Sequence, residues 1–137
     1  FIKKIGIKKY IRSKYCNYCG NAPRNEIPKI LKRGSIFALP SYYRGEGYSG
    51  AVIEAMFSGL PLLLSDWNAF SEMINRNHAL FVKPKSTKSI KSALLKLKKN
   101  PKLLSFYSQK SLERSKLFKI EKVIKNFIED HLKCVES

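Results

Sequence analysis

The sequence is short of acidic residues: 10 Asp and Glu stand against 27 Lys and Arg, which gives a formal net charge of +17. So strong a positive field attracts nucleic acid, anionic lipid headgroups or a phosphorylated substrate, and charge alone does not choose among them. Most of the basic residues are lysines along expected helices such as KSIKSALLKLKKNPK, with few aromatic residues between them. That distribution is typical of a solvated helix face.

Cysteine and histidine are scarce as well. The three cysteines are an odd number without a secretory signal, which favours a reducing compartment and free thiols. Cys16 and Cys19 have the spacing of a zinc or redox site, but KYCNYCG is expected to be a strand, on which residues three apart point to opposite faces. The other candidate ligands are isolated in the sequence: His78, His131 and Cys134. We therefore predict no metal site, because a structural zinc ion needs four ligands.

Long apolar runs are missing too. The longest candidate, LPLLLS around Pro61, is far below the roughly 18 residues that span a bilayer. A length of 137 residues fits about one domain, and the chain begins with Phe1 rather than Met, without a signal pattern. We therefore expect residues 1–137 to form a single partial domain cut from a longer protein, soluble or peripheral and cytoplasmic in location.

Glycine, proline and polar residues divide the chain into alternating strands and helices. The expected strands cover residues 14–20, 35–40, 61–65 and 79–83. The expected helices include one capped by Asn25 and ended by Gly34, one from Ser49 or Gly50 to Gly59, and one capped by Ser86 or Thr87. Apolar strands without alternation, separated by helices, predict an α/β fold: a Rossmann-like, doubly wound parallel sheet covered on both faces. A helical segment over about residues 101–133 follows it.

Apolar stripes at helical spacing mark the expected core. One stripe consists of Ile90, Ala93, Leu94 and Leu97, and the other of Ile120, Val123, Ile124, Phe127 and Ile128. We interpret both as buried against the sheet or against neighbouring helices rather than as ligand contacts. The first residues, FIKKIGIKKYI, are expected to be the remnant of a helix that precedes the first strand.

The stretch LPSYYRGEGYSGAVIEAMFSGLPLLLSD places Glu46 and Glu54 eight positions apart, around a glycine-rich turn and the start of a helix. Ligands of open parallel sheets bind outside the carboxyl ends of the strands. The glycines of the loop, Gly45, Gly47 and Gly50, allow close backbone approach or positive φ. The amides from Gly47 to Ala51 would suit a phosphate or pyrophosphate. The sequence is neither a Walker loop nor a dinucleotide-binding motif.

The two carboxylates suggest complementary contacts to one ligand. Glu54, about one turn into the helix, can accept hydrogen bonds from both hydroxyls of a ribose diol. Glu46, on the loop, would face the other end of the same ligand. The alternative is that Glu54 only complements the helix dipole on a solvent face and that Glu46 is an ordinary turn carboxylate.

The same stretch resembles the signature of retaining glycosyltransferases of the GT-B fold, family 4, also called glycosyl transferases group 1. That signature reads roughly Pro-Ser-x-x-Glu-Gly, then Glu-Ala-Met, then Gly-x-Pro before a strand, and Glu46 and Glu54 match its Glu-x7-Glu pair. The resemblance runs from about Gly20 to Leu132 and includes the expected helices NPKLLSFYSQKSLERSKLF and IEKVIKNFIEDHL. Two departures are DWNAFSE, where many members have a glycine-rich turn, and the absence of the family's earlier basic, phosphate-contacting segment.

The resemblance implies the C-terminal, donor-binding half of a GT-B fold, truncated at its N-terminus. It implies that Glu46 is the catalytic residue at the transferred sugar, that Glu54 holds the ribose, and that backbone amides approach the donor. The amides belong to Gly47, Tyr48, Ser49, Gly50 and Ala51. The implied donor is a nucleotide-diphosphate sugar, used without a metal or another cofactor, and transfer retains the anomeric configuration.

The implied partners are a sugar or lipid-linked acceptor and the missing N-terminal domain of the same enzyme, without which this chain would be inactive. A peripheral contact with the anionic inner face of the membrane is expected, and nucleic acid is not. The alternative function is a non-catalytic basic module that binds nucleic acid or an anionic membrane surface. The acidic pair favours the enzyme, because two carboxylates in the ligand loop would repel a polyanion.

Overall fold

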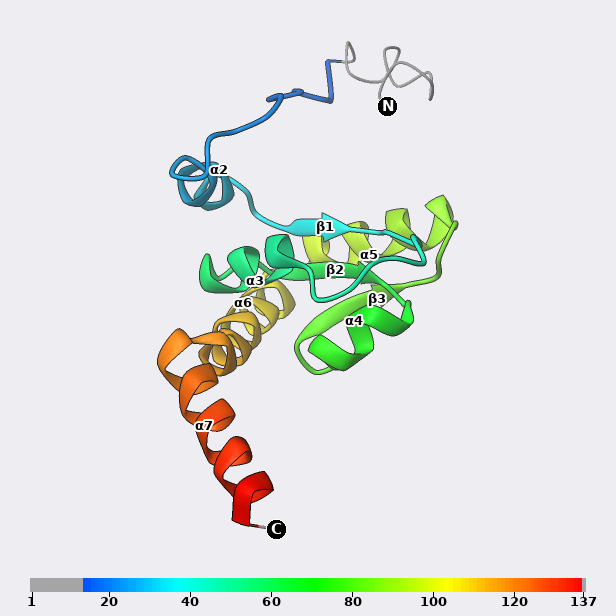
Figure 1. Cartoon of the computed structure of the whole chain (residues 1–137). Coiled ribbons are helices and arrows are strands. Elements are labelled where there is room, and N and C mark those ends of the chain that lie inside the picture. Colours follow the sequence, from blue (N-terminus) through cyan, green and yellow to red (C-terminus); the bar gives the residue numbers. More distant parts are fainter. Residues whose placement is uncertain (1–13, 137) are drawn as a thin grey trace.

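The computed structural model describes residues 14–136 (Figure 1). The expected helix over residues 1–11 lies outside them. The elements in chain order are α2 (Ile27–Lys32), β1 (Phe37–Leu39), α3 (Gly50–Phe57), β2 (Leu62–Ser65), α4 (Asn68–Met73), β3 (Ala79–Val82), α5 (Thr87–Lys99), α6 (Pro101–Ser115), the 3-10 helix η2 (Lys116–Phe118) and α7 (Ile120–Glu136).

The three strands form a parallel sheet in the order β1-β2-β3. Leu62 is paired with Phe37 on one side and with Ala79 on the other. Every residue of β2 is buried, as expected for the central strand of a parallel sheet with both faces covered. The predicted α/β, Rossmann-like architecture is confirmed, because each parallel strand is followed by a helix.

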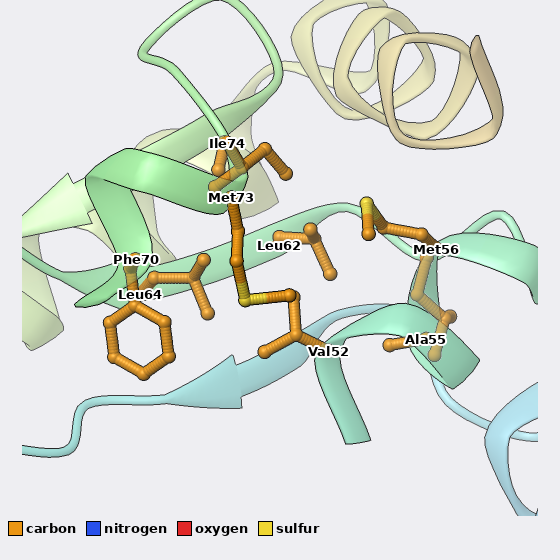
Figure 2. Close-up of a cluster of buried hydrophobic side chains, with 10 residues drawn as sticks. Val52, Ala55, Met56, Leu62, Leu64, Phe70, Met73 and Ile74 are labelled. Atoms are coloured by element: carbon orange, nitrogen blue, oxygen red, sulfur yellow. The ribbon is translucent and has the colours of Figure 1, made fainter. Parts of the chain in front are cut away.

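The larger core lies between β2 and the helices α3 and α4 (Figure 2). Leu62 and Leu64 point to this face from the strand. The cluster also contains Val52, Ala55, Met56, Leu60, Phe70, Met73, Ile74 and Ala79. Successive side chains of a strand alternate between faces, so Leu63 points to the opposite face, which α5 covers through the buried Leu97.

Helix ends follow the predicted signals at three places. α3 ends before Gly59, whose φ of +69° continues the chain in the left-handed region. The hydroxyl of Ser86 accepts a hydrogen bond from the amide of Ser89 at 3.2 Å and caps α5. The side chain of Asn100 caps α6 in the same way, directly before Pro101.

The predicted strand over residues 14–20 is wrong. This segment forms a turn followed by irregular chain, and all its residues are exposed. A strand is stable only beside a partner strand and against a core, and the described sheet consists of β1, β2 and β3 without this segment. The predicted cap at Asn25 is also wrong, because α2 begins at Ile27 with Glu26 at the cap position and no side-chain cap bond.

The predicted burial of the last apolar stripe is wrong as well. α7 extends away from the sheet (Figure 1), and Phe127, in the middle of the stripe, keeps 72% of its surface exposed. The other stripe residues are exposed too: Ile120, Val123, Ile124 and Ile128. Helical spacing predicts that a helix has an apolar face, but it does not predict which part of the protein packs against that face. The α5 stripe is buried only in part, with Leu97 inside and Leu94 37% exposed.

Candidate functional site

The loop after β1 is held against the loop after β2 at the carboxyl edge of the sheet. The hydroxyl of Ser65 donates a short hydrogen bond to the carbonyl of Ser41. The indole Nε1 of Trp67 donates to the carbonyl of Tyr43 at 3.1 Å. These two bonds fix the first half of the Pro40–Gly50 loop, where ligands of such sheets bind. DWNAFSE, which departs from the family signature, therefore supplies a loop contact through Trp67.

The middle of the loop is a tight turn around Gly45. The amide of Glu46 donates to the carbonyl of Tyr43 at 3.1 Å. A Cβ atom on Gly45 would lie 2.6 Å from the Tyr43 ring, so only glycine fits there without a shift. The group that lies close to the Gly45 backbone is the Tyr43 side chain of the same loop, and close approach of this backbone to a ligand stays a prediction.

The glycines nearer the helix behave differently. Within the described residues only Gly20 and Gly59 have positive φ among the glycines, so of the two uses expected for Gly45, Gly47 and Gly50, positive φ is not the one found. A Cβ atom on Gly47 or Gly50 would meet nothing within 4 Å. These two positions therefore leave open space at the start of α3.

The start of α3 presents backbone amides to that space. Gly50 and Ala51 are the first two helical residues, and their amides have no acceptor in the described part of the chain. The amide of Ser49 is engaged, because it donates to the Sδ atom of Met73 at 3.3 Å. The amides of Gly47 and Tyr48, on the loop before the helix, have no acceptor in the described residues either. Four of the five predicted amides are therefore available for an anion, and that of Ser49 is available only if its bond to Met73 breaks.

The two glutamates lie on the predicted elements. Glu46 is on the loop after β1 and is half-buried. Glu54 is half-buried on α3, slightly more than one turn from the helix start. Their placement on loop and helix agrees with the sequence prediction, and their roles toward a ligand remain predictions.

Met73 and Arg114 support this region and were not predicted from the sequence. The guanidinium of Arg114 donates from Nε and Nη2 to the carbonyl of Met73, at 2.8 and 2.6 Å. It also lies 5.9 Å from the centre of the Phe118 ring, and that ring is 6.5 Å from the ring of Tyr48. The contact of Arg114 with Phe118 is local, four residues apart. No spacing in the sequence signals the bonds of Arg114 to Met73 or the contact of Phe118 with Tyr48, which join residues far apart in the chain.

Two titratable groups near α6 have shifted pKa values. Burial, followed by the nearby positive charge of Arg114, lowers the pKa of His78 below 6.5. The side chain of Lys110 donates to Glu113 at 2.6 Å and lowers the pKa of that carboxyl. Neither group belongs to the loop that carries Glu46.

The described residues offer no group of three or more His, Cys, Asp or Glu side chains placed to hold a metal ion. Cys16 and Cys19 are exposed thiols. Among residues 14–136, no helix is long and apolar enough to cross a membrane.

Comparison with known proteins connects this chain to a family. A sequence model described as glycosyl transferases group 1 matches residues 4–114. The UDP-Gal:alpha-D-GlcNAc-diphosphoundecaprenol alpha-1,3-galactosyltransferase of Escherichia coli is 47% identical over 45 residues, which cover 33% of this chain and 11% of that protein. In each of five curated relatives the match covers only 11% to 29% of the relative's length.

Solved structures agree with the sequence comparisons. The C-terminal domain of a glycosyl transferase group 1 family protein (LpcC) from Francisella tularensis is 27% identical, with a TM-score of 0.66 over 75% of this chain and 53% of that one. Sucrose-phosphate synthase from Thermosynechococcus elongatus shares the fold with a TM-score of 0.77, at 20% identity, over 94% of this chain and 33% of that one. The chain therefore belongs to the glycosyl transferases group 1 family and has the fold of the C-terminal domain of a GT-B glycosyltransferase.

Proposed function

We propose that the chain is the donor-binding part of a retaining glycosyltransferase, which moves a glycosyl group from a nucleotide-diphosphate sugar to a polysaccharide or lipid-linked acceptor. The observation that carries this proposal is the start of α3, where the amides of Gly50 and Ala51 lack acceptors in the described chain. Open space beside Gly47 and Gly50 leaves room for the diphosphate. The E. coli relative is named for a UDP-sugar donor and a lipid diphosphate acceptor, which supports both substrate classes.

Each site residue has a role in this proposal. The amides of Gly50 and Ala51, with the backbone of Gly47, Tyr48 and Ser49 around them, bind the diphosphate at the positive end of the α3 dipole. Glu54 accepts hydrogen bonds from the ribose hydroxyls, and Glu46 contacts the transferred sugar. As the bond from sugar to diphosphate breaks, negative charge grows on the leaving diphosphate. The fixed amide dipoles stabilise that charge without reorganising. The hydroxyl of the acceptor forms the new bond to the anomeric carbon and gives up its proton, and no cofactor is part of the proposed transfer.

A second domain is part of the proposal, because an acceptor must approach the sugar from outside the proposed donor site. The relatives are several times longer than their matched segments, which leaves ample chain for an acceptor-binding domain. The uncovered apolar face of α7, with Phe127 at its centre, offers an area for such a domain to cover. The proposed location is the cytoplasm, where exposed thiols such as those of Cys16 and Cys19 persist.

Donor binding by the chain is tested with UDP as the probe. Titration of UDP, followed by amide NMR, should shift the resonances of Gly50 and Ala51 more than those of α7. Glu54→Gln keeps the shape of the side chain but weakens its charge-assisted hydrogen bonds, so UDP binding should weaken by about 1 to 3 kcal/mol. Glu121→Gln, on exposed α7, is the matched control and should bind UDP as the wild type does.

The roles of the two glutamates separate in kinetics of the full-length enzyme. Glu54→Gln should raise KM for the donor, whereas Glu46→Gln should lower kcat more than it changes KM, because Glu46 acts where charge develops in the transition state. Circular dichroism of each variant shows whether it is folded. If both folded variants had wild-type kinetics, the pair would be surface charge, and preferential binding of an RNA homopolymer over UDP would favour the basic-module alternative.

A further inference from the structure

Helix α5 carries a dense positive charge that the donor site does not use. Its thirteen residues contain no Asp or Glu, and its five lysines are all exposed: Lys88, Lys91, Lys96, Lys98 and Lys99. The helix covers the face of the sheet opposite to α3 and α4, to which it presents Leu97. Its lysines therefore face away from the core, and none of them belongs to the Pro40–Gly50 loop or to α3.

A hollow of about 490 Å³ lies along the boundary of α5 and β3. Three lysines and three serines contribute to its lining: Lys83, Lys88, Lys96, Ser86, Ser89 and Ser92. The Oγ of Ser86 accepts from the amide of Ser89 at 3.2 Å, and the Oγ of Ser89 accepts from the amide of Lys83 at 3.1 Å. Both hydroxyls keep their own protons to donate. With no acidic side chain in its lining, the hollow is complementary to a phosphate-bearing headgroup.

The outward face of α5 also carries an apolar side chain. Leu95 is four residues from both Lys91 and Lys99, so the three lie in one row along the helix. Its side chain is 42% exposed, and that of Leu94 is 37% exposed. Leucines among lysines are typical of helices that lie at a lipid surface, where the apolar groups enter the headgroup boundary and the amines contact phosphates.

We propose that the α5 face, defined as Lys83, Lys88, Lys91, Leu95, Lys96 and Lys99, docks the protein on a bilayer of anionic lipids. Charge complementarity selects an anionic partner. The exposed Leu95 favours a bilayer, because an apolar side chain among lysines can enter the headgroup boundary. Nucleic acid is less favoured, because α5 has no aromatic ring on which a base could stack and the ring that lines the hollow, Phe81, is half-buried. The choice of a bilayer rests on the proposed function, because a lipid-linked acceptor lies in a bilayer. The residues of the α5 face are not residues of the proposed donor site.

Lysine content alone does not distinguish this face, as α7 shows. α7 is a helix of similar exposure in which acidic residues accompany the lysines. Lys125 lies 3.7 Å from Glu129, and Lys133 lies 3.7 Å from Asp130. An anionic surface attracts α5 without repelling any acidic group of the helix, whereas α7 presents both signs. The two helices therefore provide a matched pair for an experiment at constant net charge.

The test is co-sedimentation of the chain with vesicles of phosphatidylcholine alone or of equal phosphatidylcholine and phosphatidylglycerol. Three chains are compared: wild type, the triple variant Lys88→Gln, Lys91→Gln, Lys96→Gln, and the control Lys122→Gln, Lys125→Gln, Lys133→Gln. At about 1 kcal/mol for each lysine near the surface, the α5 variant should bind anionic vesicles on the order of 100-fold more weakly. The control variant should bind anionic vesicles less than about fivefold more weakly than the wild type, since its substitutions remove only a contribution to the long-range electrostatic attraction. Leu95→Ser should weaken the binding that persists at high salt.

Equal losses in the two triple variants would overturn the proposal, because the attraction would then follow net charge rather than α5. Failure of the wild type to prefer anionic vesicles would overturn it too. An RNA homopolymer that displaces the chain from vesicles at equal phosphate concentration would assign the surface to nucleic acid. UDP binding is measured in parallel. The α5 variant should bind UDP as the wild type does. A chain that binds anionic vesicles but not UDP would contradict the donor-site proposal and would still support docking through the α5 face.

Discussion

The backbone amide of Ser49 donates a hydrogen bond to the sulfur of Met73 at 3.3 Å. This contact joins the N-terminus of α3, which presents the open amides of Gly50 and Ala51, to the last residue of α4. Figure 2 shows the Met73 side chain reaching from α4 toward Val52 of α3. Because Arg114 binds the carbonyl of the same methionine, α6 also helps to set the position of α3 and hence of the proposed donor site.

Replacement of Met73 should separate packing from hydrogen bonding. Met73→Ala leaves a cavity at a fully buried position and should cost about 2 to 5 kcal/mol of unfolding free energy. Met73→Leu conserves volume and should cost less than about 1.5 kcal/mol, while it removes the acceptor of the Ser49 amide. Hydrogen exchange at Ser49 should therefore accelerate in Met73→Leu and not in Met56→Leu, a control at another buried methionine. Unchanged exchange at Ser49 would show that the sulfur contact does not protect this amide.

Loss of the Arg114 side chain should destabilise the domain more than loss of an exposed arginine. Arg114→Gln removes two charge-assisted hydrogen bonds to the carbonyl of Met73. The free energy of unfolding, measured in urea, should fall by up to about 3 kcal/mol. Arg114→Lys should recover only part of this, because an amine cannot reproduce the planar pair of donors. The control is Arg76→Gln, which breaks an ion pair with Asp66. Since both side chains of that pair are more than half exposed, its loss should cost less than about 1 kcal/mol.

Glycine is required at Gly59 and not at Gly47. Gly59→Ala forces a side chain into the left-handed region at φ +69°, where its Cβ would also lie 3.2 Å from the Leu112 side chain. We expect a loss of at least about 1 kcal/mol in thermal or urea unfolding. Gly47→Ala meets open space and should change stability by less than about 1 kcal/mol, but it should weaken UDP binding if donor atoms occupy that space. Equal stability losses in the two variants would contradict the assignment.

Protonation of His78 should lower stability in acid. Because its pKa is lowered in the folded state by burial and by Arg114, the folded protein favours the neutral imidazole. The resulting stability is fully present above the unfolded pKa, near 6.5, and is lost as pH falls through the lowered folded value. Between about pH 7.5 and 5, wild type should therefore lose more unfolding free energy than His78→Gln. Parallel pH profiles for the two proteins would show that His78 does not contribute.

The sequence alone determined those features that local chemistry controls. Glycine at the end of α3, Ser86 before α5 and Asn100 before Pro101 act on the backbone within a few residues, and all three predicted boundaries are confirmed. The apolar strands LLLS and ALFV were predictable because continuous burial requires continuous hydrophobicity. The positions of Glu46 on the loop after β1 and of Glu54 on α3 were predictable, because the order of strand, glycine-rich loop and helix follows from local sequence signals.

Only the tertiary structure decided which predicted strands pair with another strand and which apolar helix faces are buried. The segment over residues 14–20 has strand composition but pairs with no strand of the described chain, and the apolar stripe of α7 has helical spacing but no described surface over it. Burial and strand pairing depend on groups distant in sequence. A local pattern therefore shows that a segment could pair or be buried, but not whether another part of the chain contacts it. The contacts of Met73 with Ser49 and Arg114 could not be predicted for the same reason, because they form only when folding brings α4 together with α6 and the start of α3.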